Sequence, residues 1–333
     1  MFMPKGKELT LYERERIESY LRMKKKKKWI ANKLNREYSI IKREIKRNKG
    51  EHTPYVAKDA QYYAERRKRN TNKRKLDKWQ NESLKNYVID KLNNGWSPEE
   101  IAGRLKNHPP EELKDCKDKT ISYESIYDWI YNGEGRFGGL YQNLRRKGSQ
   151  RRSQFFRKAR KNKEIIKERV SIAERPRSID ERKEIGNWET DSVLFKGKSI
   201  LSVQYERKMV LCRLHKCENK SAIRSEEALQ DSIDSLPRNF WLSITRDNGT
   251  ENALHHKTEV PSYFCDPYCP WQKGGVENLN GLIREYLPKG INLDNISDKE
   301  IYLIQERLNN RPRKKLNYLT PNEVISNELK KGL

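Results

Sequence analysis

Long apolar runs are missing from this sequence, and hydrophobic residues and cysteines are scarce in it. Only 34% of its 333 residues are hydrophobic, and no run reaches the roughly 18 apolar residues of a membrane-spanning helix. The first seven residues are not followed by an apolar segment, so no secretory signal is expected. The five cysteines are an odd number without the spacing of a disulfide framework, which fits a reducing compartment. We therefore expect a cytoplasmic protein that has no membrane partner.

The cysteines of the second half leave one alternative open, a zinc site. Cys212, Cys217, Cys265 and Cys269 lack the short spacings that zinc-binding cysteines usually show. We interpret them as core or incidental thiols.

Acidic residues are also fewer than basic residues. The chain has 72 lysines and arginines against 47 aspartates and glutamates, which gives a formal net charge of +25. Such an excess favours a polyanionic partner, most simply nucleic acid. A generally basic composition would produce the same charge, so the positions of the cations have to decide.

The cations near the N-terminus follow the layout of a DNA-binding motif. Residues 1–50 predict three short helices, with Thr10 capping the first and Ser39 the third. A run of lysines precedes the second helix and basic residues line the third, as in a helix-turn-helix motif whose last helix enters the major groove. The lysine run is expected to contact phosphate without selecting a sequence. A solvated basic helix in an ordinary bundle is the alternative. The residues predicted to contact DNA are Lys24, Lys25, Lys26, Lys27, Lys28, Ser39, Lys42, Arg43, Lys46 and Arg47.

The middle of the chain predicts a second helical unit between two basic segments. Residues 51–78 are interpreted as a basic helical linker. Residues 133–183, rich in Gly, Ser, Arg and Lys, are interpreted as a flexible basic connector. Between them, residues 79–132 contain Ser-Pro-Glu-Glu at 97–100, which is a capping box with proline at the first helical position.

The last helix of this second unit differs from its counterpart near the N-terminus. Ser122 can cap it, but Glu124 and Asp128 stand where lysines would be expected in a DNA-reading helix. Carboxylates repel phosphate, although they can accept a hydrogen bond from cytosine. We interpret residues 79–132 as a second helix-turn-helix-like domain, and leave open whether it contacts DNA or protein.

The remainder of the chain alternates strand and helix patterns. Apolar runs at 187–194, 198–203 and 209–214 predict three strands. A helix over 221–235 and a strand at 240–244 follow, and the chain ends in helices. This order predicts that residues 184–333 form a layered α/β domain.

Three carboxylates of this domain stand at positions that could converge. Asp191 lies within the first strand, Asp247 lies at the tip of a later one, and Glu277 lies in the first turn of a helix opened by two glycines. Two or three carboxylates are what a pair of hard divalent cations needs, with water and phosphate oxygens completing the shells. Each of the three alone has an ordinary structural explanation. Glu189 and Glu251 are possible substitutes for a member of the set.

The segments around these carboxylates resemble the insertion-sequence-30 family of bacterial transposases. The resemblance covers roughly residues 10–325, and its most specific part is 263–290. It is carried by Asn187-Trp-Glu-Thr-Asp191, Arg246-Asp-Asn-Gly249, Tyr268-Cys-Pro-Trp-Gln-Lys-Gly274, Glu277-Asn-Leu-Asn-Gly-Leu-Ile-Arg-Glu-Tyr286, Pro288-Lys-Gly290 and Leu308-Asn-Asn-Arg-Pro-Arg313. Further matching segments are Trp96-Ser-Pro-Glu-Glu-Ile-Ala-Gly-Arg-Leu105 and Ile121-Ser-Tyr-Glu-Ser-Ile-Tyr-Asp-Trp-Ile130.

The resemblance implies a ribonuclease-H-like catalytic domain with an Asp-Asp-Glu triad, which by position would be Asp191, Asp247 and Glu277. The sequence departs from the family at Asn252, where phenylalanine is expected. The separation of Asp247 and Glu277 (277 − 247 = 30 positions) is also short.

The resemblance also implies a reaction and its partners. The protein would cleave and join DNA with two Mg²⁺ ions, for which Mn²⁺ can substitute. Double-stranded DNA would be its partner, both as the terminal inverted repeats of its element and as the target. Two DNA ends call for a homodimer or a larger assembly, in the cytoplasm of a bacterium and associated with the nucleoid. A catalytically silent DNA-binding regulator and a nuclease without strand transfer are the alternatives.

Other residues around the triad are expected to assist it. Lys273, beside the start of the Glu277 helix, is a candidate for binding the scissile phosphate, and Arg284 is expected to contact DNA. Asn248 and Asn278 are expected to orient ligands. Trp271 either supports the site or packs in the core.

Overall fold

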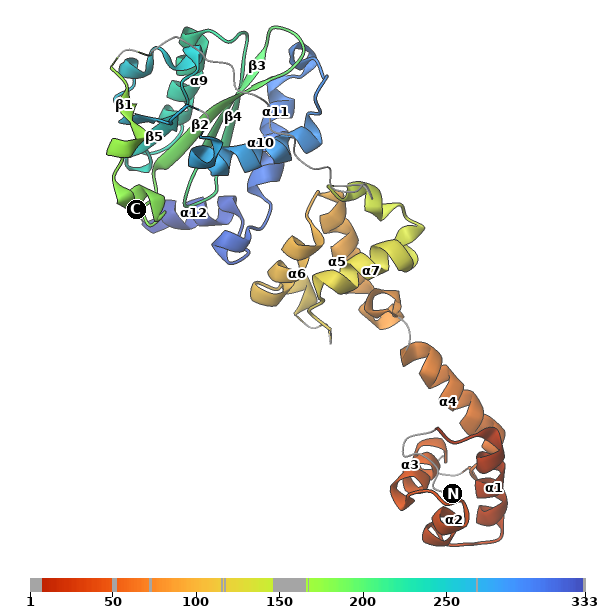
Figure 1. Ribbon diagram of the computed structural model, residues 1–333. Coiled ribbons are helices and arrows are strands. Elements are labelled where there is room, and N and C mark those ends of the chain that lie inside the picture. Colours follow the sequence, from red (N-terminus) through yellow and green to blue (C-terminus); the bar gives the residue numbers. More distant parts are fainter. Residues whose placement is uncertain are drawn as a thin grey trace. The chain divides into compact units, whose positions relative to one another are not determined.

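The computed structural model describes residues 8–49, 53–71, 74–114, 116, 118–145, 166, 168–267 and 269–331. The chain divides into two compact units, Met1–Gln80 and Asn81–Leu333, each of which is described by itself (Figure 1). In the described ranges, no helix is both long and apolar enough to cross a membrane.

The first unit is helical, and its helices pack around a small apolar core. Ile17, Ile30, Ile41 and Ile45 are almost fully buried in this core. Thr10 caps the first helix together with Glu13, as predicted. The helices of the described part are α1 (Leu11–Arg22), α2 (Lys27–Lys33), α3 (Tyr38–Asn48) and α4 (Ala57–Thr71).

The predicted cap of the third helix was wrong. Helix α3 begins at Tyr38, and its N-cap is Glu37, whose side chain makes no capping hydrogen bond. Ser39 therefore lies in the first turn of the helix, where its side chain is exposed. The start of the helix follows from the burial of Ile41 and Ile45, which turns the exposed basic face outward.

The second unit opens with the predicted helical module, made of α5 (Glu82–Asn93), α6 (Pro98–Asn107) and α7 (Tyr123–Asn132). Its capping box forms as predicted, because the Glu100 amide donates to Ser97 Oγ at 3.3 Å and the Ser97 amide donates to Glu100 Oε2 at 2.7 Å. Ser122 caps α7 by accepting from the Ser125 amide at 3.1 Å.

Parts of the predicted flexible connector have regular structure. Leu140 and Leu144 are buried beside this module. Further along, β1 (Val170–Ser171) pairs with a strand of the sheet, and α8 (Arg177–Asp180) follows it. Residues 146–165 and 167, with the arginine-rich centre of that connector, lie outside the described residues.

A six-stranded sheet forms the centre of the rest of the unit. Its strand order is β1-β6-β5-β2-β3-β4. Strands β2, β3 and β4 are antiparallel neighbours, whereas β5 runs parallel to β2, and β6 and β1 continue in that direction. The remaining bounds are β2 (Asn187–Leu194), β3 (Ile200–Glu206), β4 (Cys212–Cys217), β5 (Ser243–Arg246) and β6 (Ser262–Phe264).

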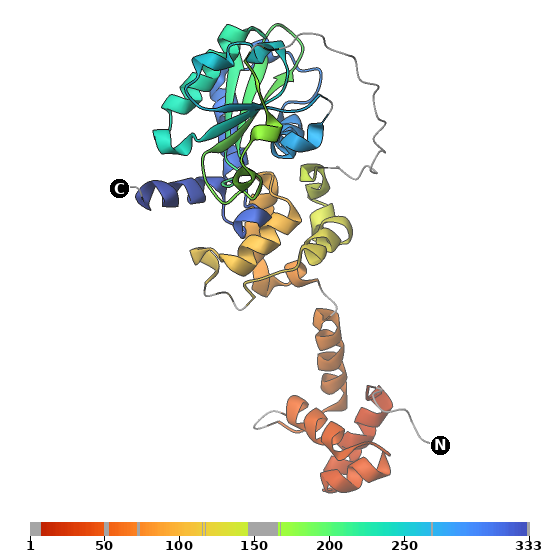
Figure 2. The same cartoon turned by 60° about the vertical axis from the view of Figure 1, so that its left-hand side comes forward.

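Helices cover both faces of this sheet (Figure 2). One face packs against α10 (Gly274–Tyr286) and α11 (Asp298–Asn309) through a core that includes Val203, Leu279 and Leu308. The other face packs against α9 (Ala222–Asp234) and α12 (Pro321–Lys331). This arrangement of strands and helices is the ribonuclease-H-like fold, so the predicted fold class is confirmed: helical helix-turn-helix modules followed by an α/β domain.

Helix α6 contacts the α/β domain. Arg104 donates to both carboxylate oxygens of Glu323 at 2.7 and 2.5 Å. A Cβ atom on Gly103 would lie 2.1 Å from the ring of Tyr318, so only glycine permits this approach. Helix α6 therefore packs against the α/β domain of the same chain, and the choice between DNA and another protein as the partner of the second module is still open.

Candidate active site and nucleic-acid interface

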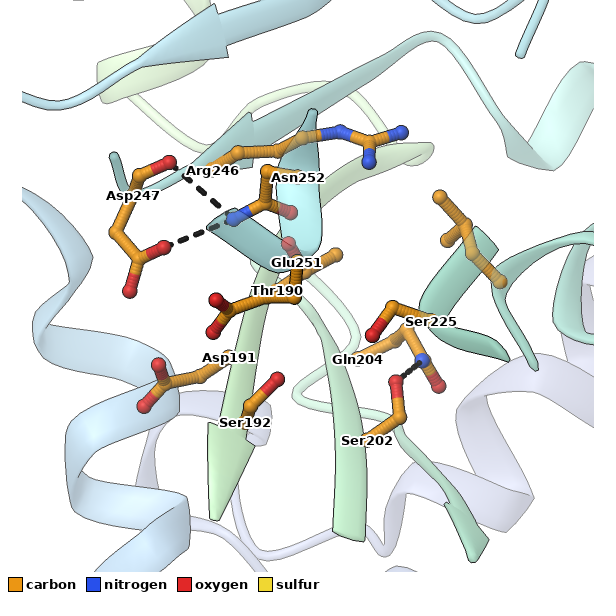
Figure 3. A pocket seen from close by; sticks show the side chains of 11 residues that line it. Thr190, Asp191, Ser192, Ser202, Gln204, Ser225, Arg246, Asp247, Glu251 and Asn252 are labelled. Atoms are coloured by element: carbon orange, nitrogen blue, oxygen red, sulfur yellow. Dashed lines mark hydrogen bonds between the residues drawn. The ribbon is translucent and has the colours of Figure 1, made fainter. Parts of the chain in front are cut away.

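The two aspartates of the predicted triad lie side by side because of the register between β2 and β5. These strands are parallel, and Glu189 pairs with Thr245. Two residues further along each strand are Asp191 and Asp247. Residues two apart point to the same face of a sheet. The register therefore brings the carboxylates together, Asp191 from within β2 and Asp247 from the residue after β5, beside a small polar pocket that Figure 3 shows.

Lys273 supplies the cation between the two aspartates. Its Nζ atom lies 3.4 Å from Asp191 Oδ1 and 3.3 Å from Asp247 Oδ2, and donates to the Thr190 carbonyl at 2.9 Å. The side chain is buried, with 7% of the residue exposed. Burial alone would lower the pKa of Lys273, but the two carboxylates raise it above its ordinary value, so the amine is charged. Lys273 is a counter-ion of the two aspartates in this structure, and its contact with the scissile phosphate stays a prediction.

The outer oxygens of both aspartates are held by amides. Asp191 Oδ2 accepts from Asn280 Nδ2 at 2.6 Å. Asp247 Oδ1 accepts from the Gly249 amide at 3.0 Å and from Asn252 Nδ2 at 2.8 Å (Figure 3). Asn252 thus uses a polar contact at a position where the family pattern has phenylalanine. Asn280 was missed as a site residue, although it lies one helical turn after the predicted Glu277 on the same face of the helix.

Glu277 lies in the first turn of α10, as predicted. The side chain is exposed, but the protein around its carboxyl group and the negative charge of Asp191 raise its pKa, against the opposite effect of Lys273. Glu277 is therefore close enough to Asp191 for the charge of that aspartate to raise its pKa. Among the described residues, no three His, Cys, Asp or Glu side chains are gathered closely enough to hold one metal ion.

The possible substitutes for triad members have structural partners. Glu189 is 1% exposed and accepts from the Val276 amide at 2.9 Å, at the start of α10. Glu251 pairs with Lys220 at 3.2 Å and packs against Gly249, where a Cβ atom would lie 2.4 Å from its carboxylate. Glu189 thus fixes the backbone at the start of α10, whereas Glu251 forms an ion pair in the turn that follows Asp247.

The remaining predicted residues lie around the site in different settings. Asn248 donates to the Cys265 carbonyl at 2.7 Å and thereby fixes the loop after β5. The guanidinium carbon of Arg284 lies 4.2 Å from the centre of the Phe195 ring, and Arg284 donates to the Leu194 carbonyl at 2.7 Å. Burial lowers the pKa of Arg284. Its predicted DNA contact stays a prediction.

Trp271 and Asn278 both face solvent. Trp271 is 73% exposed, so the alternative that it packs in the core is wrong. Asn278 is exposed and lines a groove together with Lys314 and Lys315.

The basic residues predicted near the N-terminus are all on the surface. Lys24 to Lys28 are exposed, and so is the predicted reading face of α3. That face consists of Ser39, Lys42, Arg43, Lys46 and Arg47. The buried isoleucines of the same helix lie on its other side.

Comparison with known protein families supports the helix-turn-helix motif predicted near the N-terminus. Residues 5–48 match the model of a helix-turn-helix domain. Among solved structures, the catalytic core domain of BIV integrase is similar at 20% identity, with 44% of this chain and 98% of that chain covered and a TM-score of 0.33. The HTLV-2 integrase catalytic core domain in complex with magnesium covers 42% of this chain and 95% of its own, at 19% identity and a TM-score of 0.32.

Similarity to transposases extends over nearly the whole chain. The transposase InsI for insertion sequence element IS30A of Escherichia coli K12 is 39% identical over 324 residues, which are 95% of this chain and 83% of that protein. The transposase for insertion sequence element IS4351 of Bacteroides fragilis is 34% identical over 330 residues, or 96% and 95% of the two chains. The chain therefore belongs to the IS30 family of transposases, which are polynucleotidyl transferases of the DDE type.

Proposed function

We propose that this transposase binds the terminal inverted repeats of its own insertion sequence and cleaves and joins DNA with Asp191, Asp247 and Glu277. The observation that carries the proposal is the convergence of Asp191 and Asp247 on a single cation, Lys273 Nζ, from neighbouring strands of the sheet. Glu277 lies close enough that Asp191 raises its pKa. The chain acts where its DNA is, in the bacterial cytoplasm with the nucleoid.

The donor set suits a hard divalent cation. Two carboxylates that already share one positive charge offer the oxygen ligands that Mg²⁺ prefers. We propose two Mg²⁺ ions, with Mn²⁺ as a substitute, which Asp191, Asp247 and Glu277 would hold. When bound, such ions lower the pKa of the attacking hydroxyl or water and stabilise the leaving oxygen.

The reaction proceeds by two phosphoryl transfers. Water attacks a phosphodiester at the end of the element, and the freed 3′ hydroxyl then attacks a phosphodiester of the target, so each step breaks one P–O bond as another forms. Asn280 and Asn252 hold the two aspartates in orientation. Positioning and charge neutralisation provide most of the rate in such reactions.

The first unit supplies DNA recognition. The exposed lysines 24–28 bind phosphates, and the outer face of α3 reads base edges in the major groove. Since two DNA ends have to be processed, we propose that a homodimer or a larger assembly forms on DNA.

Substitution of the acidic residues tests the catalytic assignment. We expect Asp191→Asn, Asp247→Asn and Glu277→Gln each to lower strand cleavage by about 10⁴-fold, because groups that act as a unit fail together. The substrate is a duplex that carries the inverted repeats flanking the coding region, cleaved in Mg²⁺. Binding of that duplex, measured without metal, should be unchanged.

The matched control is Asp266→Asn. Asp266 is an exposed carboxylate whose Oδ2 accepts from Gln272 at 2.9 Å and which contacts neither aspartate of the site. Its loss should leave cleavage intact. A Glu277→Gln variant that cleaves normally would remove Glu277 from the triad. Cleavage without joining of ends to a second duplex would indicate a nuclease, and the absence of nicks under all conditions a DNA-binding regulator.

A further inference from the structure

A group of cationic side chains beside Glu189 has fewer anionic partners than its charge requires. Its members, here called the arginine cluster, are Arg175, Arg182, Arg207 and Lys315. They come from four segments: the residue after a short 3-10 turn, the loop after α8, the residue after β3, and the 3-10 turn Lys314–Leu316. Folding thus brings together cations that lie far apart in the sequence.

Two carboxylates face these four cations. Asp180 Oδ1 accepts from Arg175 and, at 3.4 Å, from Arg207 Nη2. Glu189 Oε1 lies 3.5 Å from Arg207 Nε. Burial lowers the pKa of Arg207, and the positive charges of Arg175 and Arg182 lower it further despite the opposite effect of Glu189.

Several guanidinium nitrogens of the cluster have no hydrogen-bond partner. These are Arg175 Nε, Arg182 Nη1, and Arg207 Nε and Nη1. Arg207 is 6% exposed and Arg175 is 9% exposed, so these donors lie away from bulk solvent. A buried donor on a charged group is costly when it is left unsatisfied. An additional anion would satisfy both the charge and the donors.

Asp180 marks the place where such an anion can enter. Its side chain is 58% exposed, although both arginines that it contacts are buried. It lies at the end of α8, which has only four residues. Arg182 is half-buried and Lys315 is exposed, so an anion can reach both side chains from solvent. An incoming anion can therefore take over the contacts that Asp180 makes.

The cluster is next to the proposed catalytic site. Glu189 precedes Asp191 by two residues on β2, so both point to the face covered by α10. Lys315 also lines the groove that contains Asn278, the residue after Glu277. The groove therefore connects one member of the cluster, Lys315, with the first turns of α10, in which Glu277 also lies.

We propose that the arginine cluster binds one phosphate of the DNA backbone beside the position of strand cleavage. Guanidinium groups suit this role because their planar donors match the oxygens of a phosphate. The identification of the phosphate as DNA rests on the proposed function, whereas the anion site itself does not.

The first test uses inorganic phosphate and the full-length chain without metal. Thermal unfolding is followed in phosphate and in chloride at equal ionic strength, because a ligand that binds the folded state raises the midpoint. We expect Arg182→Gln and Arg207→Lys to weaken phosphate binding about tenfold, as the loss of one charged hydrogen bond does. Asp180→Asn should strengthen it, since the competing carboxylate is gone.

Lys208→Gln is the matched control. It removes the same charge one residue after Arg207, from an exposed side chain. This variant should behave as the wild type. A merely structural role of Asp180 would not produce tighter phosphate binding, so a loss or no change in Asp180→Asn contradicts the anion site, as does wild-type phosphate binding by Arg182→Gln.

The second test separates DNA from free phosphate. Affinity for a duplex of arbitrary sequence is measured without metal at several salt concentrations. Arg182→Gln should reduce the slope of log K against log salt by about one, and Lys208→Gln should leave it unchanged. Lost phosphate binding with an unaltered slope would overturn the assignment to DNA. A failure of strand cleavage with both tests positive would count against the proposed triad alone.

Discussion

Two sets of cationic side chains, one from each unit of this chain, differ in exposure and in ion pairing. In the first unit, lysines 24–28 and the basic face of α3 are exposed. In the second unit, Lys273, Arg246 and Arg311 are 7%, 2% and 5% exposed, and each contacts carboxylates. A net charge of +25 therefore combines two populations of cations. The exposed cations are free to bind a polyanion, whereas these three buried cations are paired with carboxylates.

The two populations should also differ in what they contribute to the free energy. Exposed charges are screened by salt and act mainly on binding. A buried ion pair contributes little net stability, but removal of one partner leaves the other charge unpaired in a site of low polarity. Substitutions of buried cations that are paired with carboxylates should thus change folding, and substitutions of exposed cations should change DNA affinity.

The largest effect is expected from Arg311→Met. Arg311 Nη2 lies 3.0 Å from Glu100 on α6 and its Nη1 lies 3.4 Å from Glu285 on α10. Both carboxylates lose this buried partner in the variant, so we expect the free energy of unfolding to fall by about 3 kcal/mol. Chemical unfolding followed by circular dichroism measures the change.

Lys314→Gln is the matched control for this substitution, because Lys314 also pairs with a glutamate of α6. Lys314 pairs with Glu99 at 3.3 Å, but both side chains are largely exposed. We expect no measurable change in stability. If Arg311→Met left stability unaltered and weakened DNA binding instead, the distinction between the two populations would break.

A smaller effect, on binding alone, is expected from the exposed population. Substitution of lysines 24–28 by glutamine should reduce the slope of log K against log salt by about one for every phosphate contact that is lost. Lys299→Gln, an exposed lysine on α11 of the second unit, should leave the slope unchanged. Unfolding of both variants should match the wild type. An unchanged slope in the lysine-run variant would contradict the assignment of the first unit to phosphate contact.

Local features of both units could be predicted from the sequence. Thr10, Ser97 and Ser122 cap helices as predicted, because a cap depends on residues three positions apart. The strand position of Asp191 and the helical position of Glu277 followed from apolar periodicity in the same way. These signals are contained in short windows of sequence.

Contacts across the chain could not be predicted in this way. Lys273 and Asp191 are 82 positions apart, and Arg311 and Glu100 are 211 apart. Nothing near Lys273 in the sequence distinguishes it from a lysine that faces solvent, so its contacts with the two aspartates could not be predicted. The pairing of the two-residue strand β1 with β6 has no local signal either. Burial by distant segments decides which cations become counter-ions.

The smallest effect concerns two asparagines near the carboxylates, one buried and one exposed. Asn252 is 9% exposed and holds Asp247 Oδ1 at 2.8 Å, whereas Asn278 is exposed. We expect Asn252→Ala to weaken Mn²⁺ binding by the DNA-free protein about tenfold, as loss of a hydrogen bond to a ligating group does. Asn278→Ala should leave it unchanged. Calorimetric titration with Mn²⁺ measures both, and equal thermal midpoints exclude a general loss of folding. Equal Mn²⁺ affinities in the two variants would mean that the Gly249 amide alone suffices to orient Asp247. Burial of a polar side chain beside the site would then not by itself indicate a role in metal binding.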